Sequence, residues 1–247
     1  MKNLRPLYLL LILVGASTCV HAQDDEGAKF RFGLKGAPSM AWLKPDSKLF
    51  ESGGATVKFS YGLITEFRVA KNYSFVTGLD VAYAGGKINY TDSIYYLSDA
   101  GDPTKAYFQL NKRKFDLQYV DLPVLLKMKT NEIGYMTYFG QFGFNLGLNI
   151  KSRAIDEGTT YASTQTVKKE DVDVIKDINL MRVAMNLGIG VEYNFSGSTS
   201  LLLGVNYNNG FSNTFGKESK SLKQKDGSAL ETKAVSNYVA LTVGVLF

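Results

Sequence analysis

The chain is short of the residues that enzymes most often use for nucleophilic and metal chemistry. Its 247 residues include one cysteine, Cys19, and one histidine, His21. Both lie in a segment, 1–22, that we expect to be cleaved off. The mature chain could then form no disulfide, no thiolate nucleophile, no histidine-containing triad and no His/Cys zinc site. We therefore predict no enzyme activity, with no catalytic residue, no cofactor and no metal ligand.

Long apolar runs are also scarce. The one at the start, 7–14, follows Lys2 and Arg5 and precedes Val-His-Ala at 20–22. This order is typical of a secretory signal peptide, and the run is too short and wrongly flanked for a spanning helix. A lipid-modified Cys19 is the alternative, although the three residues before it match such a junction poorly. No later stretch approaches 18 continuous apolar residues, so the sequence predicts no transmembrane helix.

A strong charge of one sign is missing as well. The formal net charge is +5, and removal of Lys2 and Arg5, with no acidic residue alongside, lowers it by two to +3. Because the remaining charge is mild and evenly spread, we expect no nucleic-acid partner. Residues 23–247 are expected to form a single domain.

What the sequence does contain is alternation with a period of two. Apolar and aromatic residues alternate with polar residues and glycines, for example over 55–70, 135–152 and 178–194. Such alternation predicts strands with two unlike faces. Eight strands are expected, at 29–37, 55–70, 73–89, 113–129, 135–152, 178–194, 199–209 and 234–247.

The connections between these strands alternate in length. Those at 70–72, 130–134 and 195–198 are tight, whereas the others are long, polar and charged. Outer-membrane barrels have short periplasmic turns, long extracellular loops and an even number of strands. The sequence therefore predicts an all-β fold: an eight-stranded antiparallel transmembrane up-and-down β-barrel in the outer membrane of a Gram-negative cell.

The direction of the two faces follows from the cost of burying charge in lipid. With the polar face outward, Lys58, Arg68 and Arg182 would meet hydrocarbon, at a cost of roughly 2–4 kcal/mol each near the midplane. The polar face must therefore line the lumen, where buried charges need partners. We predict a structural network of lumen charges: Glu66, Arg68, Asp80, Asp121, Lys127, Arg182 and Glu192. Acid–base chemistry, a proton path or a narrow pore are the alternatives for this lumen.

The run YVDLPVLLK, Tyr119 to Lys127, carries a proline inside an apolar strand. Its period places four aliphatic residues toward lipid, Val120, Leu122, Val124 and Leu126, and places Asp121, Pro123 and Lys127 inward. Because a proline cannot donate to a sheet ladder, we expect a β-bulge at Pro123. Three residues in phase with Asp121 either fill the upper lumen or change sides at such a bulge: Phe115, Leu117 and Tyr119.

The chain ends in a strand that closes on Phe247. This ending is similar to the signal by which the outer-membrane assembly machinery recognises its substrates, so we expect that machinery as a partner during biogenesis. Tyr and Phe also gather near the predicted strand ends, as interfacial girdles require. The nine girdle residues are Tyr61, Phe67, Tyr73, Phe75, Tyr83, Tyr135, Tyr138, Tyr193 and Phe195.

Three stretches together resemble the PorT-like outer-membrane barrel family of Bacteroidota: Tyr119 to Lys127, FGLKG at 32–36 and GQFGFNLGL at 140–148. The resemblance extends over essentially the whole mature chain. It implies an eight-stranded barrel with its amino terminus in the periplasm. The founding member of that family serves protein secretion through the type IX pathway, but no motif here ties this chain to that role.

Three classes of function stay open on the sequence. The first is a non-enzymatic barrel with a filled lumen, whose loops or periplasmic rim bind a partner, including a secretion or envelope-assembly protein. The second is a small lipid-modifying enzyme of the outer membrane. The third is a soluble lipocalin-like ligand carrier, in which the apolar face would point inward. Outer-membrane lipid and lipopolysaccharide are expected partners. We expect the lysine-rich run 217–225 to be a solvated loop, and contact with lipopolysaccharide phosphates is the alternative for it.

Overall fold

The computed structural model describes residues 29–46, 50–96, 108–160, 163–196, 199–224 and 228–247. The expected signal peptide, 1–22, lies outside the described residues. Within the described ranges, no helix has the length and apolarity needed to cross a membrane.

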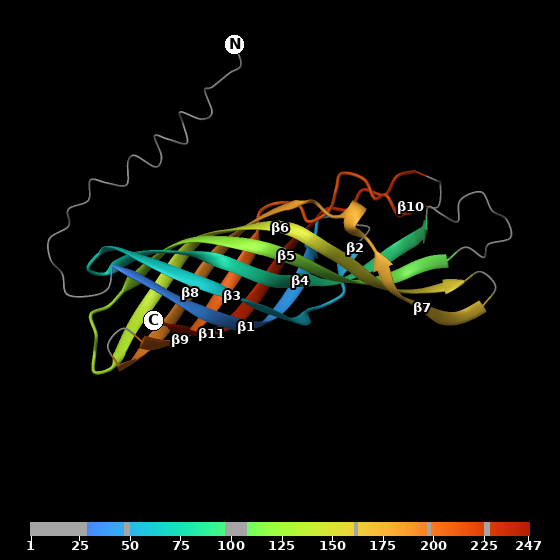
Figure 1. The fold of residues 1–247 in the computed structure, drawn as a ribbon. Helices are drawn as coiled ribbons and strands as arrows, with labels where there is room; N and C mark the ends of the chain where they lie inside the picture. The colour runs from blue at the N-terminus through green and yellow to red at the C-terminus, as the bar shows by residue number, and fades with distance from the viewer. Residues whose placement is uncertain (1–28, 47–49, 97–107, 161–162, 197–198, 225–227) are drawn as a thin grey trace, which may run out of the picture.

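Eight long antiparallel strands form a closed ring (Figure 1). Each strand pairs with its neighbours in the chain, and the first pairs with the last, from Gly33 opposite Leu246 to Pro45 opposite Ala234. The ring therefore has no open edge, as a bilayer requires. In ring order the strands are β1 (Phe30–Pro45), β3 (Thr56–Ala70), β4 (Tyr73–Tyr96), β5 (Phe108–Lys129), β6 (Met136–Thr160), β8 (Met181–Ser196), β9 (Thr199–Gly210) and β11 (Ala234–Leu246).

All eight predicted strands are confirmed, but several are longer than expected. β4 runs on to Tyr96 and β5 begins at Phe108, and the two strands pair beyond their expected outer ends, at Ile94 opposite Leu110 and Tyr95 opposite Gln109. The segment 153–177 was expected to be a loop, and that prediction was wrong. It continues β6 to Thr160 and returns as β7 (Ser163–Asp173), which pairs with β6. Thr, Val and Ile in this segment favour extended backbone, and the end of β6 offers an edge to pair with.

The three middle strands thus project well past the rest of the ring (Figure 1). Two short strands pair with β4 there: β2 (Phe50–Ser52) and β10 (Leu222–Gln224). A 3-10 helix, η3 (Ile175–Asp177), leads from β7 toward β8. We call the projecting part the outer extension; it comprises the described residues of 50–52, 85–96, 108–116, 153–178 and 211–233. The tight turns lie at the opposite, periplasmic end, with Phe30 and the carboxyl terminus.

The apolar face of the ring points outward. Leu63, Phe142 and Ile189, on three different strands, are 51%, 46% and 71% exposed. The nine predicted girdle aromatics are all exposed by at least 36%. Polar side chains alternate with them and are buried in the lumen. This orientation excludes the lipocalin-like carrier, whose apolar face would line the interior.

Pro123 sits in an unbroken register, so the predicted bulge at this residue was wrong. On the β6 side, Pro123 lies opposite Asn145 within a continuous ladder. On the β4 side, pairing resumes after a gap with the same register, from Val76 opposite Leu125 to Asp80 opposite Asp121. The missing N–H of Pro123 falls in this gap, and the sheet absorbs it without an extra residue. The two register shifts of β5 with β6 lie nearer the outer end, between Leu110 and Lys112 and between Gln118 and Tyr119.

The upper lumen is filled with apolar side chains. Phe115, Leu117 and Tyr119 all point inward and are 0–2% exposed, which settles their two alternatives in favour of filling the lumen. They belong to one buried cluster that reaches into the outer extension and includes Leu43, Ile88, Phe108, Leu110, Phe215 and Leu230. This packing gives the extension a core of its own.

Candidate functional site in the barrel lumen

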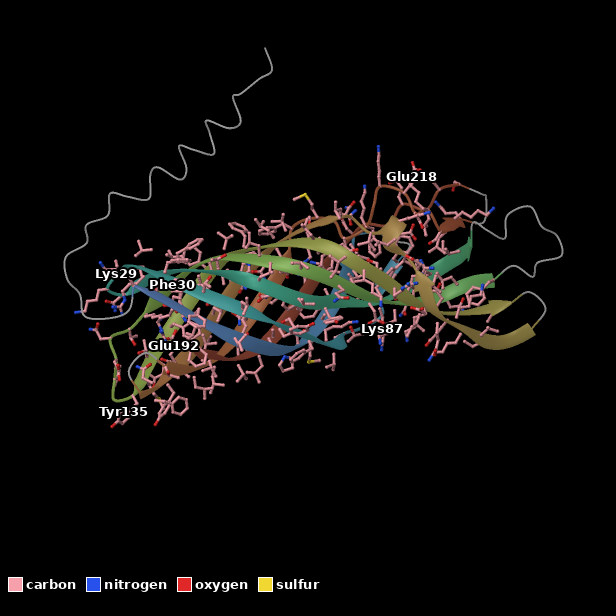
Figure 2. All side chains as sticks on the ribbon, in the orientation of Figure 1. Lys29, Phe30, Lys87, Tyr135, Glu192 and Glu218 are labelled. Atoms are coloured by element: carbon pink, nitrogen blue, oxygen red, sulfur yellow. The ribbon has the colours of Figure 1, made fainter. Side chains whose placement is uncertain are left out.

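The periplasmic end of the lumen holds a cluster of charged side chains around Lys127. This lysine is fully buried on β5 and lies between two carboxylates from other strands, Glu66 of β3 and Glu192 of β8. Its Nζ is 3.3 Å from Glu66 Oε2 and also donates to Glu192 Oε1. The same ammonium lies 4.2 Å from the centroid of the Phe139 ring, a cation–π contact. Figure 2 shows Glu192 near this end of the barrel, on the side of Tyr135.

Two further cations complete this cluster. Arg31 Nη1 is 2.7 Å from Glu192 Oε2, and Lys129 Nζ is 3.0 Å from Glu192 Oε1 and also contacts Glu66. The periplasmic charge cluster therefore consists of Arg31, Glu66, Lys127, Lys129 and Glu192, with three positive and two negative charges. The prediction missed Arg31 and Lys129. Their position would have been found from their even spacing with Lys35 and Lys127, which puts them on the inward face.

A second ion pair lies at the level of the upper lumen. Arg182 Nη2 is 2.5 Å from Asp121 Oδ2, and both residues are buried. The guanidinium carbon lies 4.4 Å from the Tyr119 ring centroid and 5.7 Å from that of Tyr238. A Cβ at Gly147 would come within 2.3 Å of Asp121 Oδ1, so this glycine leaves room for the pair. The stacked, salt-bridged guanidinium is a rigid part of the lumen wall.

Asp80 forms a pair of its own. It lies directly opposite Asp121 on the neighbouring strand, an arrangement that destabilises a sheet when both carboxylates are charged and unpaired. Lys35 of β1 is 2.7 Å from Asp80 and neutralises it. The prediction did not include Lys35, although its phase with Arg31 places it in the lumen.

Arg68 is not part of the network, and its inclusion was wrong. It is exposed at the end of β3, where the register with β4 shifts before Ala70. Its backbone N–H donates to Lys29 O across the strand end. Because this residue lies in the periplasmic water, its charge needs no buried partner.

Between the two charged levels lies a layer of side-chain amides. Asn145 Nδ2 donates to Asn208 Oδ1 at 2.7 Å, and Gln141 Nε2 donates to Asn206 Oδ1 at 2.7 Å. Asn206 in turn donates to the hydroxyl of Thr242 at 2.7 Å. These groups line a cavity of about 50 Å³. That space has room for a few waters, because about 10–15 Å³ suffices for one.

A polar node ties the outer extension together above the apolar cluster. Arg113 of β5 donates two hydrogen bonds to Asp156 of β6, at 2.6 and 2.7 Å, and both side chains are buried. Asp177 accepts from the backbone N–H of Lys220 at 2.5 Å and of Ser221 at 3.2 Å. These contacts fix the segment between β9 and β11 onto the hairpins.

Nearby, Tyr90 is buried edge-on against Phe50, with ring centroids 5.3 Å apart. Burial raises the pKa of the Tyr90 hydroxyl above its usual value, so it stays protonated. The extension is thus an ordered structure with its own packing, and its core carries neutral and paired groups.

Buried side chains occupy the lumen at two levels, one on each side of the cavity. On the periplasmic side of the cavity lies the charge cluster, in which Lys127, Glu66 and Glu192 are only 0–3% exposed. Above it, the apolar cluster presents Leu117 and Leu43 at 0%. Together these features define a small transmembrane barrel with a filled interior and a structured outer extension.

Comparison with known proteins places the chain in a family. The family model described as outer membrane protein beta-barrel domain matches residues 21–216, about four fifths of the chain. The chain therefore belongs to this family of outer-membrane β-barrels, and the outer membrane is its location. No curated protein matches it.

Solved structures of outer-membrane proteins are similar to it in fold. The outer membrane protein OprG from Pseudomonas aeruginosa is 10% identical, with a TM-score of 0.47, over 91% of this chain and 99% of that one. Neisserial surface protein A is 14% identical, with a TM-score of 0.42, over 90% and 98%. Ail, the attachment invasion locus protein of Yersinia pestis, is 11% identical, with a TM-score of 0.35, over 89% and 100%.

Proposed function

We propose that this protein is a non-enzymatic, non-conducting barrel that binds a partner protein through its outer extension. The observation that carries the proposal is the contrast between the lumen and the outer extension. The lumen is filled by paired charges and apolar side chains, whereas the extension is an ordered structure with its own buried core. A surface of that kind can hold a fixed shape toward a partner at little entropic cost.

The periplasmic rim is smaller than the outer extension. Its described connections are the tight turn at 71–72 and the short segment 130–135. The exposed apolar residues there are Ile133 and Tyr135, at 64% and 67%. On the outer extension, Val167 and Ile175 are 37% and 43% exposed beyond the lipid belt. Apolar groups in water at a rigid, projecting site favour protein contact.

The partner class we favour is an envelope or secretion protein. The resemblance of Tyr119 to Lys127, 32–36 and 140–148 to the PorT-like barrels of Bacteroidota supports this choice, since that family includes a secretion accessory protein. We include the chain in that group as part of the proposal. A lipid-modifying enzyme is the less favoured class, because the lumen carboxylates at both charged levels are held by cations.

The test is a crosslinked pull-down of tagged protein from native outer membranes, with two matched variants. Val167→Thr with Ile175→Ser alters the outer extension, and Ile133→Ser with Tyr135→Ser alters the periplasmic rim. We expect the same envelope proteins with the wild type and the rim variant, and their loss with the extension variant. Loss with the rim variant alone would move the binding site to the periplasm. Recovery of only lipid from the wild type would overturn the partner-binding proposal.

A further inference from the structure

A basic groove lies on the outside of the barrel, just beyond the lipid belt. It has a volume of about 500 Å³ and is lined by four lysines and one glutamate, together with the outer end of β3. The lysines are Lys87 of β4, Lys112 and Lys114 of β5, and Lys168 of β7. With Glu157 of β6 as the counter-charge, the lining carries a net charge of +3. Figure 2 shows Lys87 at the outer part of the barrel, on the side away from Glu218.

The strand phase places these lysines on the lipid-side face of the sheet. The residues of β5 that alternate with Lys112 and Lys114 are Arg113 and Phe115, and they point into the protein, with 1% and 2% exposure. Lys112 and Lys114 therefore point outward. On β4, Lys87 has the same phase as the exposed girdle residue Tyr83. The groove is thus continuous with the surface that meets the membrane.

Among the described residues, the charges in the groove are only partly balanced. Lys87 and Lys114 lie directly opposite each other on paired strands, and Lys112 lies opposite Asn89 two residue pairs further out. Like charges directly opposite each other destabilise a sheet. Lys168 is 3.7 Å from Glu157, and Lys114 is 3.9 Å from Asp116, which also pairs with Lys58. In the described part of the chain, no ion pair is formed by Lys87 or Lys112. A bound anion would remove this repulsion.

The height of the groove identifies the anion. Lys87 is four residues beyond Tyr83, which is about 13 Å along a strand and, with the usual tilt, about 10 Å along the membrane normal. The polar layer of a leaflet is about 5–8 Å thick beyond the hydrocarbon. A lysine ammonium, carried on a flexible stem, can lean back toward that layer. The groove therefore faces the phosphate groups of outer-leaflet lipids.

We infer that this groove binds the phosphate groups of the glycolipid of the outer leaflet, lipopolysaccharide. Lysines bind phosphate as point charges, and the groove presents four of them around one concave surface. The glycolipid would lie with its acyl chains against the exposed face of β3 and β4 and its phosphates among the lysines. This site differs from the lysine-rich run 217–225 that the sequence suggested, and it does not depend on the partner-binding role of the extension.

The test measures binding of lipopolysaccharide to purified, folded protein in detergent by native mass spectrometry, at two salt concentrations. The groove variant is Lys87→Gln with Lys112→Gln and Lys114→Gln. A matched control, Lys217→Gln with Lys220→Gln, removes lysines from the segment between β9 and β11. A juxtamembrane lysine contributes about fivefold to the binding of anionic lipid, so the groove variant should bind about 100-fold more weakly. The control should bind like the wild type, and raised salt should weaken wild-type binding.

Further probes separate the possible sources of the anion. Chemically dephosphorylated lipopolysaccharide should bind about as weakly to the wild type as the intact glycolipid binds to the groove variant. Lys→Arg substitutions at the same three positions should keep binding, which shows that charge and not folding is at issue. Wild-type affinity in the groove variant, or equal binding of the dephosphorylated glycolipid, would overturn the inference. Loss of binding only in the control variant, or stronger binding of a soluble sulphated polysaccharide than of lipopolysaccharide, would also overturn it.

Discussion

The periplasmic charge cluster predicts an asymmetry between the two signs of charge. Arg31, Lys127 and Lys129 carry three positive charges, and Glu66 and Glu192 carry two negative charges. Glu192→Gln would raise the net charge of this buried cluster from +1 to +2, whereas Lys127→Met would lower it to zero. Glu192 contacts all three cations and has one carboxylate neighbour. Its removal therefore leaves cations without compensation inside the barrel.

The expected magnitudes follow from this count. Breaking a buried ion pair by removing one partner costs about 3–5 kcal/mol of stability. We expect a loss in that range for Glu192→Gln. For Lys127→Met we expect about 1 kcal/mol, because two attractive contacts are lost, repulsion with Lys129 is relieved, and methionine keeps the packing on Phe139. The double variant should be more stable than Glu192→Gln alone.

The assay is urea unfolding of the barrel in lipid vesicles, followed by fluorescence of Trp42, the single tryptophan. A change in midpoint without a change in slope reports stability. Glu218→Gln, at an exposed residue of the outer extension, serves as the control and should shift stability by less than about 0.5 kcal/mol. The reasoning is refuted if Lys127→Met is as destabilising as Glu192→Gln, or if the double variant is the least stable of the three.

Three other substitutions have expected outcomes. Asp121→Asn should destabilise the barrel by about 3–5 kcal/mol in the same urea assay, and adding Arg182→Met should recover part of that loss, since the stranded guanidinium goes with it. Pro123→Ala should change stability by less than about 1 kcal/mol, because the ladder with β4 already lacks pairs there; a larger change would mean that the proline is needed for the register. Phe247→Ala should lower the amount of barrel assembled in cells several-fold, while refolding of the purified protein is little affected. The Phe247 ring also contacts Phe32, and equal losses in both measurements would assign Phe247 to stability alone.

The strands and the direction of their faces could be predicted from the sequence because each pattern extends over many residues. Period-two alternation repeats over 10 or more residues in strands such as β3 and β8, and the cost of charge in lipid decides which face is outside. The outer parts of β6 and β7 could not be predicted in this way. They pair outside the membrane, where both faces are partly polar and the alternation is lost.

The lumen charges were predictable as a set but not in their pairing. Phase alone places Lys127 and Glu192 inside, yet whether they meet depends on strand register, which sequence alternation does not encode. Arg31 was missed because it lies near the start of a predicted strand, where the neighbouring inward position is Gly33 and the polar face is short. Arg68 was included because its phase is inward, but phase carries no information on where the water begins. The basic groove draws its lysines from β4, β5 and β7, so it depends on the outer parts of these strands, where β7 was not predicted.

The central claim is that the lumen is filled and that the protein acts through its surfaces. Ion conductance of purified, folded protein in planar lipid bilayers tests this claim most directly, with an open porin incorporated in the same way as a positive control. The account predicts no steady current steps from this protein while the porin conducts. Reproducible, steady conductance steps from protein that migrates as a folded barrel before heating would contradict it and would make the lumen a pore.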